Sequence, residues 1–246
     1  MKRIAVTLLT VAGLSACQTP PGETASSSAQ PSQVALCQVH GRNDVSQAKI
    51  DACSAILARG GSSDEIAHAY ANRGMLYWAT GRIEKASADL DAAVAAAPGR
   101  ADLYLNRGAL RAQLGDYGHA EQDYRKALVL DPSNPGAMNN LARVQIVRGD
   151  YAAGLEWIDR AVVMKSDLDV FHDTRAHALM GLGRFDAAEQ AFDRAMAVGG
   201  PARVQRYQRQ LAVKGYDPGH FDGVMDDASR AALRACIRDN CRLMLD

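Results

Sequence analysis

Three asparagines recur at one fixed interval, and their amide groups are suited to shared hydrogen-bonding chemistry. Asn72, Asn106 and Asn140 lie 34 residues apart, and Thr174 occupies the fourth place in the series. Asparagine is mildly unfavourable inside helices, so its repetition there requires an explanation. Its amide both donates and accepts hydrogen bonds, which suits the backbone of an extended peptide. We call this series of four positions the asparagine ladder. It is interpreted either as a row of side chains that binds a peptide or as a set of side chains that hydrogen-bond neighbouring structural units to each other.

The sequence contains no group of residues with the types and spacing of a known catalytic motif. The six histidines are scattered, and His172 and His177 are five residues apart, so they share a helix face poorly. There is no Gly-x-Ser-x-Gly element and no glycine loop of the phosphate-binding type. Without Lys2 and Arg3 of the leader, 26 basic and 28 acidic residues remain, which gives no electrostatic case for nucleic acid. We predict a protein that is not an enzyme and that carries no metal or cofactor.

The interval of 34 residues also governs other residue types, so the asparagines belong to a repeating structure. In each unit a glycine separates two helical stretches, for example 67–80 and 84–96, and a left-handed glycine is suited to ending the first. In the second stretch a small residue, a bulky residue and an alanine share one face, which lets the two helices pack closely. The periodic small residues are Gly81, Gly115, Gly149, Gly183, Ala86, Ala120, Gly154, Ala188, Ala93, Ala127, Ala161 and Ala195.

These units resemble tetratricopeptide repeats. The first carries Tyr70, Gly74, Tyr77, Gly81, Ala86, Leu90, Ala93 and Pro98, and the second carries Tyr104, Gly108, Gly115, Ala120, Tyr124, Ala127 and Pro132. The third and fourth units are weaker, since Ala142 and Ala176 replace the early glycine. The resemblance covers residues 67–200 and implies an all-α, right-handed solenoid. It also implies a scaffold that binds a protein partner.

The groove formed by the first helices of the units is the strongest candidate site. Beside the ladder, other side chains on the same side of these helices would set selectivity for the partner. The predicted groove residues are His68, Asn72, Met75, Trp78, Leu105, Asn106, Asn140, Arg143, Thr174 and His177.

Residues 1–16 are typical of an export signal, with two basic residues before the apolar run 4–12. This run is too short to span a bilayer. The motif Leu-Ser-Ala-Cys at 14–17 resembles the bacterial lipobox, which implies lipid attachment at Cys17; an ordinary signal peptide with an incidental cysteine is the alternative. Because Gln18 is not the aspartate that retains such lipoproteins in the inner membrane, the resemblance implies an outer-membrane anchor facing the periplasm.

Residues 17–36 are rich in Pro, Ser, Thr, Gln and Ala and lack apolar periodicity after Cys17, which predicts a flexible tether. Residues 37–66 follow, and within them 44–58 match the second helix of a repeat. This half-repeat would cap the array, because a stack of repeats otherwise exposes apolar surface at its end.

Four cysteines remain once Cys17 is lipidated, and an even number in an oxidising compartment suggests two disulfides. They are Cys37, Cys53, Cys236 and Cys241. Three pairings are open. Four stacked repeats, at about 8–10 Å per helix layer, separate the two chain ends by roughly 40 Å, which favours the local pairs 37–53 and 236–241. The second pair requires a helix break near residues 239–240. A metal site built on residues 37, 40 and 53 is a weaker alternative.

Residues 201–246 leave the repeat pattern and predict a small helical domain. They resemble the peptidoglycan-binding domain of cell-wall hydrolases through Gln208, Leu211, Gly215-Tyr216, Asp222-Gly223, Ser229-Arg230 and Ala232. They depart from that family at Met225-Asp226 and at Cys236-Ile237. The resemblance implies glycan contacts, whereas the alternative is a simple cap on the solenoid. The residues implied are Gln208, Tyr216, Asp217, Asp222, Gly223 and Arg230.

Two functions from different classes follow. The first is a non-catalytic periplasmic adaptor, anchored by lipid, that binds a periplasmic or envelope protein in its groove and peptidoglycan through its C-terminal domain. The second is a structural envelope protein that ties the outer membrane to the cell wall.

Overall fold

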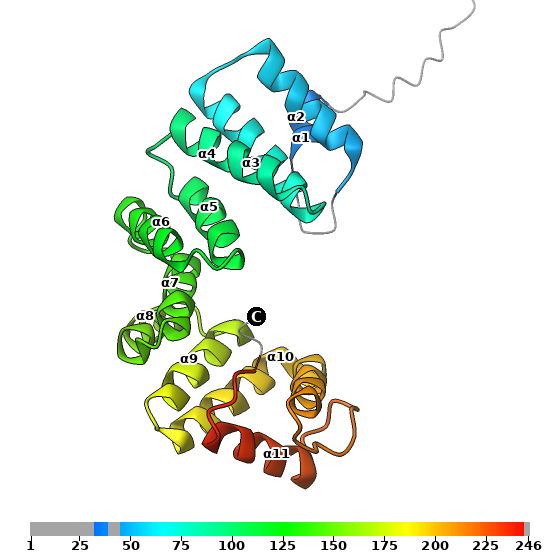
Figure 1. Cartoon of the computed structure of the whole chain (residues 1–246), viewed down its shortest axis with the longest axis vertical. Helices are drawn as coiled ribbons and strands as arrows, with labels where there is room; N and C mark the ends of the chain where they lie inside the picture. The colour runs from blue at the N-terminus through cyan, green and yellow to red at the C-terminus, as the bar shows by residue number, and fades with distance from the viewer. Residues whose placement is uncertain (1–31, 39–44, 244–246) are drawn as a thin grey trace, which may run out of the picture. The chain divides into compact units, whose positions relative to one another are not determined.

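The computed structural model describes residues 32–38 and 45–243, and all the regular secondary structure within them is helical (Figure 1). The all-α prediction is confirmed for this part of the chain. The predicted leader, the lipidation site Cys17 and the tether up to residue 31 lie outside the described residues. None of the described helices has the length and apolar content that a membrane span requires.

Eleven helices follow one another within the described ranges. They are α1 (Gln33–Cys37), α2 (Gln47–Arg59), α3 (Ser63–Ala79), α4 (Ile83–Ala96), α5 (Ala101–Gln113), α6 (Tyr117–Leu130), α7 (Pro135–Val147), α8 (Tyr151–Met164), α9 (Asp169–Gly181), α10 (Phe185–Val213) and α11 (Asp227–Arg238). Gly200 interrupts α10 with a non-helical backbone (φ 63°, ψ −162°), so 185–199 and 201–213 are two helices.

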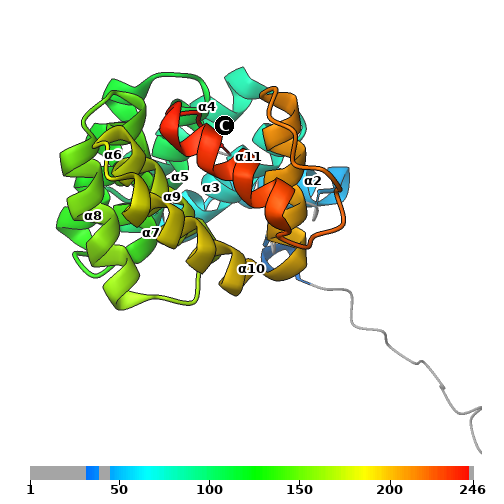
Figure 2. The same cartoon turned by 90° about the horizontal axis from the view of Figure 1, so that it is seen from below.

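The helices are ordered as antiparallel pairs along the chain. The first helices of the four units are α3, α5, α7 and α9, and the second helices are α4, α6, α8 and residues 185–199. Each helix packs on its neighbour in sequence, and each first helix also contacts the next first helix (Figures 1 and 2). Residues that are 34 positions apart in sequence therefore lie at matching places on neighbouring first helices.

Glycine ends the first helix of every unit. Gly81, Gly115, Gly149 and Gly183 have φ angles of 73°, 81°, 88° and 70°, which side chains with a Cβ rarely adopt. In each case the following residue donates its N–H to a carbonyl five residues earlier, as in Arg82 to Tyr77 at 2.8 Å. This hydrogen bond satisfies a carbonyl that the helix end leaves open and turns the chain towards the second helix.

Small and large side chains alternate between the two helices of a unit. Gly108 of α5 lies so close to α6 that a Cβ at this position would come within 2.8 Å of the Tyr124 ring. Ala120, Tyr124 and Ala127 of α6 are buried, as their shared helix face predicts. Close approach of the two helices therefore depends on the small residue on one side and the ring on the other.

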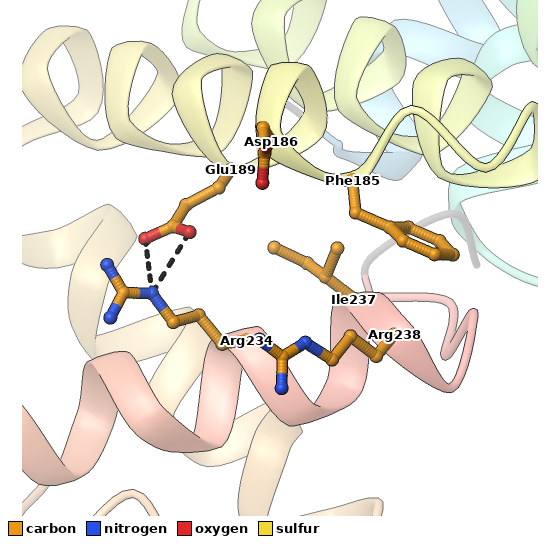
Figure 3. Close-up of a pocket in the computed structure, with 6 residues that line it drawn as sticks. All are labelled: Phe185, Asp186, Glu189, Arg234, Ile237 and Arg238. Atoms are coloured by element: carbon orange, nitrogen blue, oxygen red, sulfur yellow. Dashed lines mark hydrogen bonds and ion pairs between the residues drawn. The ribbon is translucent and has the colours of Figure 1, made fainter.

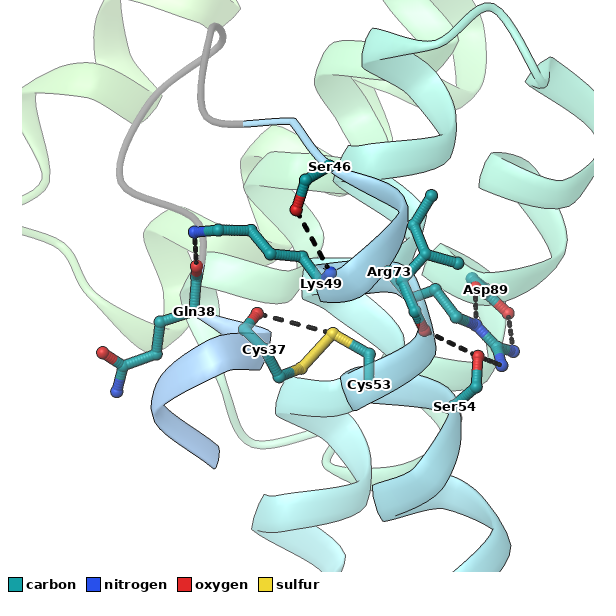
Figure 4. Close-up of a disulfide and its surroundings, with 9 residues drawn as sticks. Cys37, Gln38, Ser46, Lys49, Cys53, Ser54, Arg73 and Asp89 are labelled. Atoms are coloured by element: carbon teal, nitrogen blue, oxygen red, sulfur yellow. Dashed lines mark hydrogen bonds and ion pairs between the residues drawn. A yellow bond between two sulfur atoms is a disulfide. The ribbon is translucent and has the colours of Figure 1, made fainter. Parts of the chain in front are cut away.

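A short helical cap covers the N-terminal end of the first unit. Ile50 and Ile56 of α2 pack with Ala69 and Leu76 of α3 in one apolar cluster. A disulfide from Cys37 to Cys53 joins α1 to α2, the local pairing that the sequence favours (Figure 4). The cap removes from solvent the apolar face that the first unit would otherwise expose.

The structure corrects two boundaries near this cap. Residues 33–36, predicted as tether, belong to α1, because Ser32 caps the helix and Cys37 is buried in the cap cluster. Local composition does not reveal this helix, since a disulfide and tertiary packing stabilise it. Helix α3 begins at Ser63 rather than at 67, because Ser62 and Glu65 form a capping box.

Arginine–aspartate pairs join the two helices of the first two units, which the sequence analysis missed. Arg73 binds both carboxylate oxygens of Asp89 at 2.7 and 2.8 Å. Arg107 repeats the contact one unit later, with Asp123 at 3.1 and 2.7 Å, and Arg111 adds a bond of 2.9 Å. The detectable signal is an arginine followed by an aspartate sixteen residues later in two adjacent units. Bidentate pairs of this kind fix the angle between helices as well as the contact.

We predict unequal effects from two aspartates that bind the same arginines. The Asp123 side chain is 4% exposed, and Asp123→Ala should lower the free energy of unfolding by about 3 kcal/mol, because the arginine charges lose their buried partner. The Asp91 side chain also bonds Arg107 and Arg111 but is 51% exposed. Asp91→Ala should therefore cost less than about 1 kcal/mol. Denaturant unfolding followed by circular dichroism measures both, and equal losses would contradict this account.

Candidate functional site

The asparagine ladder lies along the first helices, and its two ends differ. Asn72 of α3 and Asn106 of α5 are half-buried and make no hydrogen bond to any described residue. Asn140 of α7 is also half-buried, and its Oδ1 accepts a long bond of 3.4 Å from Asn139. Unpaired amides at a partly exposed helix face are available to a ligand backbone.

Apolar groups and an indole accompany the unpaired asparagines. Met75, Trp78 and Leu105 are half-buried. The Trp78 Nε1 donates to Gln113 Oε1 at 3.0 Å, which links α3 to α5 across the boundary between units. His68 is exposed and contacts Arg100, whose guanidinium is paired with Asp102 at 2.6 Å. This end of the row of first helices thus combines unpaired amides with partly exposed apolar side chains.

Thr174 does not line an open groove. Its side chain is buried, and its hydroxyl lies 2.9 Å from both Asn139 Oδ1 on α7 and Val170 O on α9. The alternative interpretation of the ladder, bonding between neighbouring units, therefore applies at this position. Thr174 differs from Asn72 and Asn106 because it is buried and its hydroxyl is bonded within the protein.

His177 is also buried, which corrects its prediction as an accessible selectivity residue. The C-terminal segment of the chain covers it, and the Leu243 backbone N–H donates to His177 Nε2 at 2.9 Å. On the other side of the ring, Nδ1 lies 2.8 Å from the Asp173 carbonyl oxygen. Burial lowers the pKa of His177 and raises the pKa of the Asp173 carboxyl, which accepts a 2.6 Å bond from Tyr207. Arg143 places its positive charge near both groups.

Gln208 is a fifth member of the ladder, 34 residues after Thr174, although the sequence analysis placed it in the glycan site. It is fully buried, and its Oε1 accepts from Gly223 N at 3.0 Å. Its Nε2 donates to Val224 O at 2.9 Å and to Ser229 Oγ at 3.0 Å. Gln208 and the buried Gly223 therefore hold the C-terminal loop in place and are not presented to a ligand.

The other residues implied for glycan binding are engaged in bonds within the protein. Asp217 and Asp222 are exposed, and each carboxylate accepts a backbone N–H of its own turn. Tyr216 is half-buried and donates to Asp239 Oδ2 at 2.8 Å. Arg230 of α11 pairs with Glu189 at 3.3 Å and Asp193 at 3.0 Å on α10. These bonds attach α11 to the fourth repeat.

A hollow of about 240 Å³ lies between residues 185–199 of α10 and α11 (Figure 3). Its lining includes Glu189, which binds Arg234 at 2.8 Å, and the apolar side chain of Ile237. The carboxylate and the guanidinium neutralise each other, so neither charge is left for a ligand. We therefore interpret the hollow as part of the contact between the fourth repeat and α11. Among the described residues, no three His, Cys, Asp or Glu side chains gather in a way that would hold a metal ion.

Comparisons with known proteins agree with the geometry of the helix pairs. A tetratricopeptide-repeat model matches residues 71–135 and 111–168, and a second model of this repeat matches residues 170–194. None of the curated protein sequences matches the chain.

Solved structures share the fold at low sequence identity. The crystal structure of MamA matches with a TM-score of 0.54 and 19% sequence identity, and the match covers 62% of this chain and 87% of that one. YrrB, described as a TPR protein with an unusual peptide-binding site, is 19% identical, with a TM-score of 0.55 over 77% of this chain and 94% of that one. The glycine-ended helix pairs, their 34-residue period and the two family-model matches together show that the chain contains tetratricopeptide repeats.

Proposed function

We propose that this protein is a non-catalytic scaffold that binds the extended backbone of a protein partner along α3, α5 and α7. The observation that carries the proposal is the pair of half-buried amides, Asn72 and Asn106, which bond to no described residue. Each hydrogen bond to a ligand backbone would contribute a net stabilisation of about 0.5–1.5 kcal/mol. Met75, Trp78 and Leu105 would select the partner's side chains.

The chain's own C-terminal segment supports this mode of binding. At the other end of the row of first helices, Leu243 offers its backbone N–H to a side chain of α9, and its own side chain is buried. A first helix of this protein therefore accepts a main-chain N–H through a side-chain hydrogen bond. The similar structure of YrrB, described as having a peptide-binding site, is consistent with the same use of the fold.

We further propose that the scaffold is a lipoprotein anchored to the outer membrane at Cys17 and facing the periplasm. The support is the leader with its lipobox-like motif at 14–17 and the two disulfides, which suit an oxidising compartment. The partner would then be a periplasmic or envelope protein.

A second candidate function is a tie between the outer membrane and the cell wall. The loop before α11 exposes Phe221 and Val224, which are 46% and 60% exposed, next to the carboxylate of Asp222. An exposed ring beside an acidic group offers an apolar face and a hydrogen-bond acceptor to a sugar of peptidoglycan. This surface is separate from the asparagines of α3 and α5 in sequence and in its supporting helices.

We expect the double substitution Asn72→Ala and Asn106→Ala to weaken peptide binding without loss of stability. The ligand is a peptide selected on the wild-type protein from a display library of random peptides, with its Kd measured by fluorescence polarisation. Loss of two backbone bonds should raise the Kd about 5-fold to 100-fold. The free energy of unfolding should not fall, because alanine is favoured over asparagine inside a helix.

Asn139→Ala is the matched control for this experiment. Asn139 is buried and accepts the Thr174 hydroxyl, so its loss should lower the free energy of unfolding by about 1 kcal/mol and leave the Kd within about twofold. A library that enriches no peptide on the wild-type protein relative to the double variant would overturn the groove proposal.

Cys17→Ala should move the protein out of the membrane fraction or leave its leader uncut. The reason is that only the thiol of Cys17 would carry the lipid. Membrane fractionation and electrophoretic migration of the full-length protein, expressed in a bacterium with lipoprotein processing, check this outcome. Unchanged fractionation and migration would contradict the lipoprotein proposal and leave the groove proposal untouched.

Phe221→Ala should reduce sedimentation of the protein with purified peptidoglycan by at least about fivefold, if the ring packs on a sugar. Val213→Ala is the control, because Val213 is 85% exposed on the preceding helix and lies outside the loop. Equal sedimentation of wild type and both variants, or none at all, would refute the cell-wall tie.

A further inference from the structure

The end of the described chain folds back onto α9. Helix α11 ends at Arg238, and Asn240 adopts a left-handed backbone (φ 52°), which asparagine tolerates better than most residues. Cys241 donates its N–H to Cys236 O at 2.9 Å, and a disulfide joins these two residues. The turn is therefore closed by two bonds, and it directs residues 241–243 towards the fourth repeat.

Leu243 makes two contacts that hold this segment. Its side chain is fully buried in the main apolar core, together with residues of α9 and α10. Its backbone N–H donates to His177 Nε2 at 2.9 Å, across 66 residues of sequence. This hydrogen bond of the segment to α9 thus ends on a titratable ring.

The hydrogen bonds of His177 require the neutral ring. A carbonyl oxygen only accepts, so Nδ1, 2.8 Å from Asp173 O, carries the ring proton. The other nitrogen, Nε2, must then be unprotonated, and its lone pair accepts the Leu243 N–H. If Nε2 also took up a proton, its N–H would point at the Leu243 N–H across 2.9 Å, and the hydrogen bond between them would be lost.

The surroundings of His177 oppose a second positive charge. The positive charges of Arg143 of α7 and Arg242 of the segment both lower the pKa of the ring, and the Phe192 ring on α10 makes an edge contact with it. Asp173 of α9 favours the charged ring, but its carboxylate accepts the Tyr207 hydroxyl of α10 at 2.6 Å. Burial, the largest influence, lowers the pKa of His177. A proton is therefore accommodated best after the ring has become exposed.

We propose that residues 240–243 form a latch on α9 that is closed while His177 is neutral and opens when His177 takes up a proton. Opening breaks the Leu243–His177 hydrogen bond and uncovers His177 together with the apolar site of Leu243. The disulfide keeps the released segment close to α9, so that closure is rapid when the proton leaves. This latch does not depend on the partner proposed for α3, α5 and α7.

The direction of the pH dependence follows from the two states. The open state exposes a histidine of ordinary pKa, about 6.5, and binds protons more readily than the closed state. Closure is therefore fully favoured above about pH 7. As the pH falls below about 6.5, the equilibrium constant for closing the latch should decrease by up to about tenfold for each pH unit. The decrease ends when the pH reaches the lowered pKa of His177 in the closed state.

Amide hydrogen exchange at Leu243, measured by NMR on the full oxidised chain, tests the latch. After correction for intrinsic exchange, wild-type protection should fall about tenfold or more between pH 7.5 and pH 5, while amides in the centre of α9 keep theirs. His177→Gln retains an acceptor that does not titrate, so its Leu243 protection should be equal at both pH values. His172→Gln is the control: His172 is also buried on α9 but bonds Ser166 O, and this variant should behave as wild type.

Protection of Leu243 that does not change down to pH 5, or that falls equally in wild type and His177→Gln, would overturn the proposal. A second measurement covers the case in which His177→Gln does not fold. In the wild-type protein, Leu243 protection should begin to fall at about pH 6.5, and the ¹³C and ¹⁵N shifts of the His177 ring should change only at lower pH, where the open state becomes populated. A His177 ring that takes up its proton while Leu243 keeps its full protection would equally refute the latch.

Discussion

A pair of helices of this kind cannot bury its own apolar faces, and this constraint shapes the whole molecule. The close approach of Gly108 to Tyr124 buries the surface between the two helices of one unit. The apolar surface that remains on the outside of the pair must be covered by the next unit. The buried core accordingly continues from α3 to Leu243. Such a stack has no natural end, so both of its ends require special structures.

The two ends meet this requirement differently. At the N-terminal end, α1 and α2 form a small apolar cluster closed by the disulfide from Cys37 to Cys53. At the C-terminal end, a buried polar network around Gln208 orders the loop that precedes α11. The chain then returns to α9 through Leu243. Both ends are thus sealed by apolar packing and a disulfide, and the C-terminal end adds a buried network of hydrogen bonds.

Neighbouring groups also decide which part of the asparagine ladder remains available. Thr174 bonds to Asn139 of α7, and Gln208 bonds to the loop before α11. The same periodic positions on α3 and α5 face no such neighbour, and Asn72 and Asn106 keep their amides unpaired within the described residues. One repeated sequence position therefore has two roles, structural near the C-terminal end and available for binding near the N-terminal end.

Sequence alone determined the helix pairs, their 34-residue period and the glycine at the end of each first helix, because these depend on residues close in sequence and repeat four times. It also favoured the two local disulfides that the structure contains. It could not show that α1 is helical or that Leu243 covers His177. Only the tertiary structure decided these points, because each depends on a contact whose partner cannot be inferred from local propensity. Burial by a distant segment changes a candidate ligand-binding side chain into part of the fold.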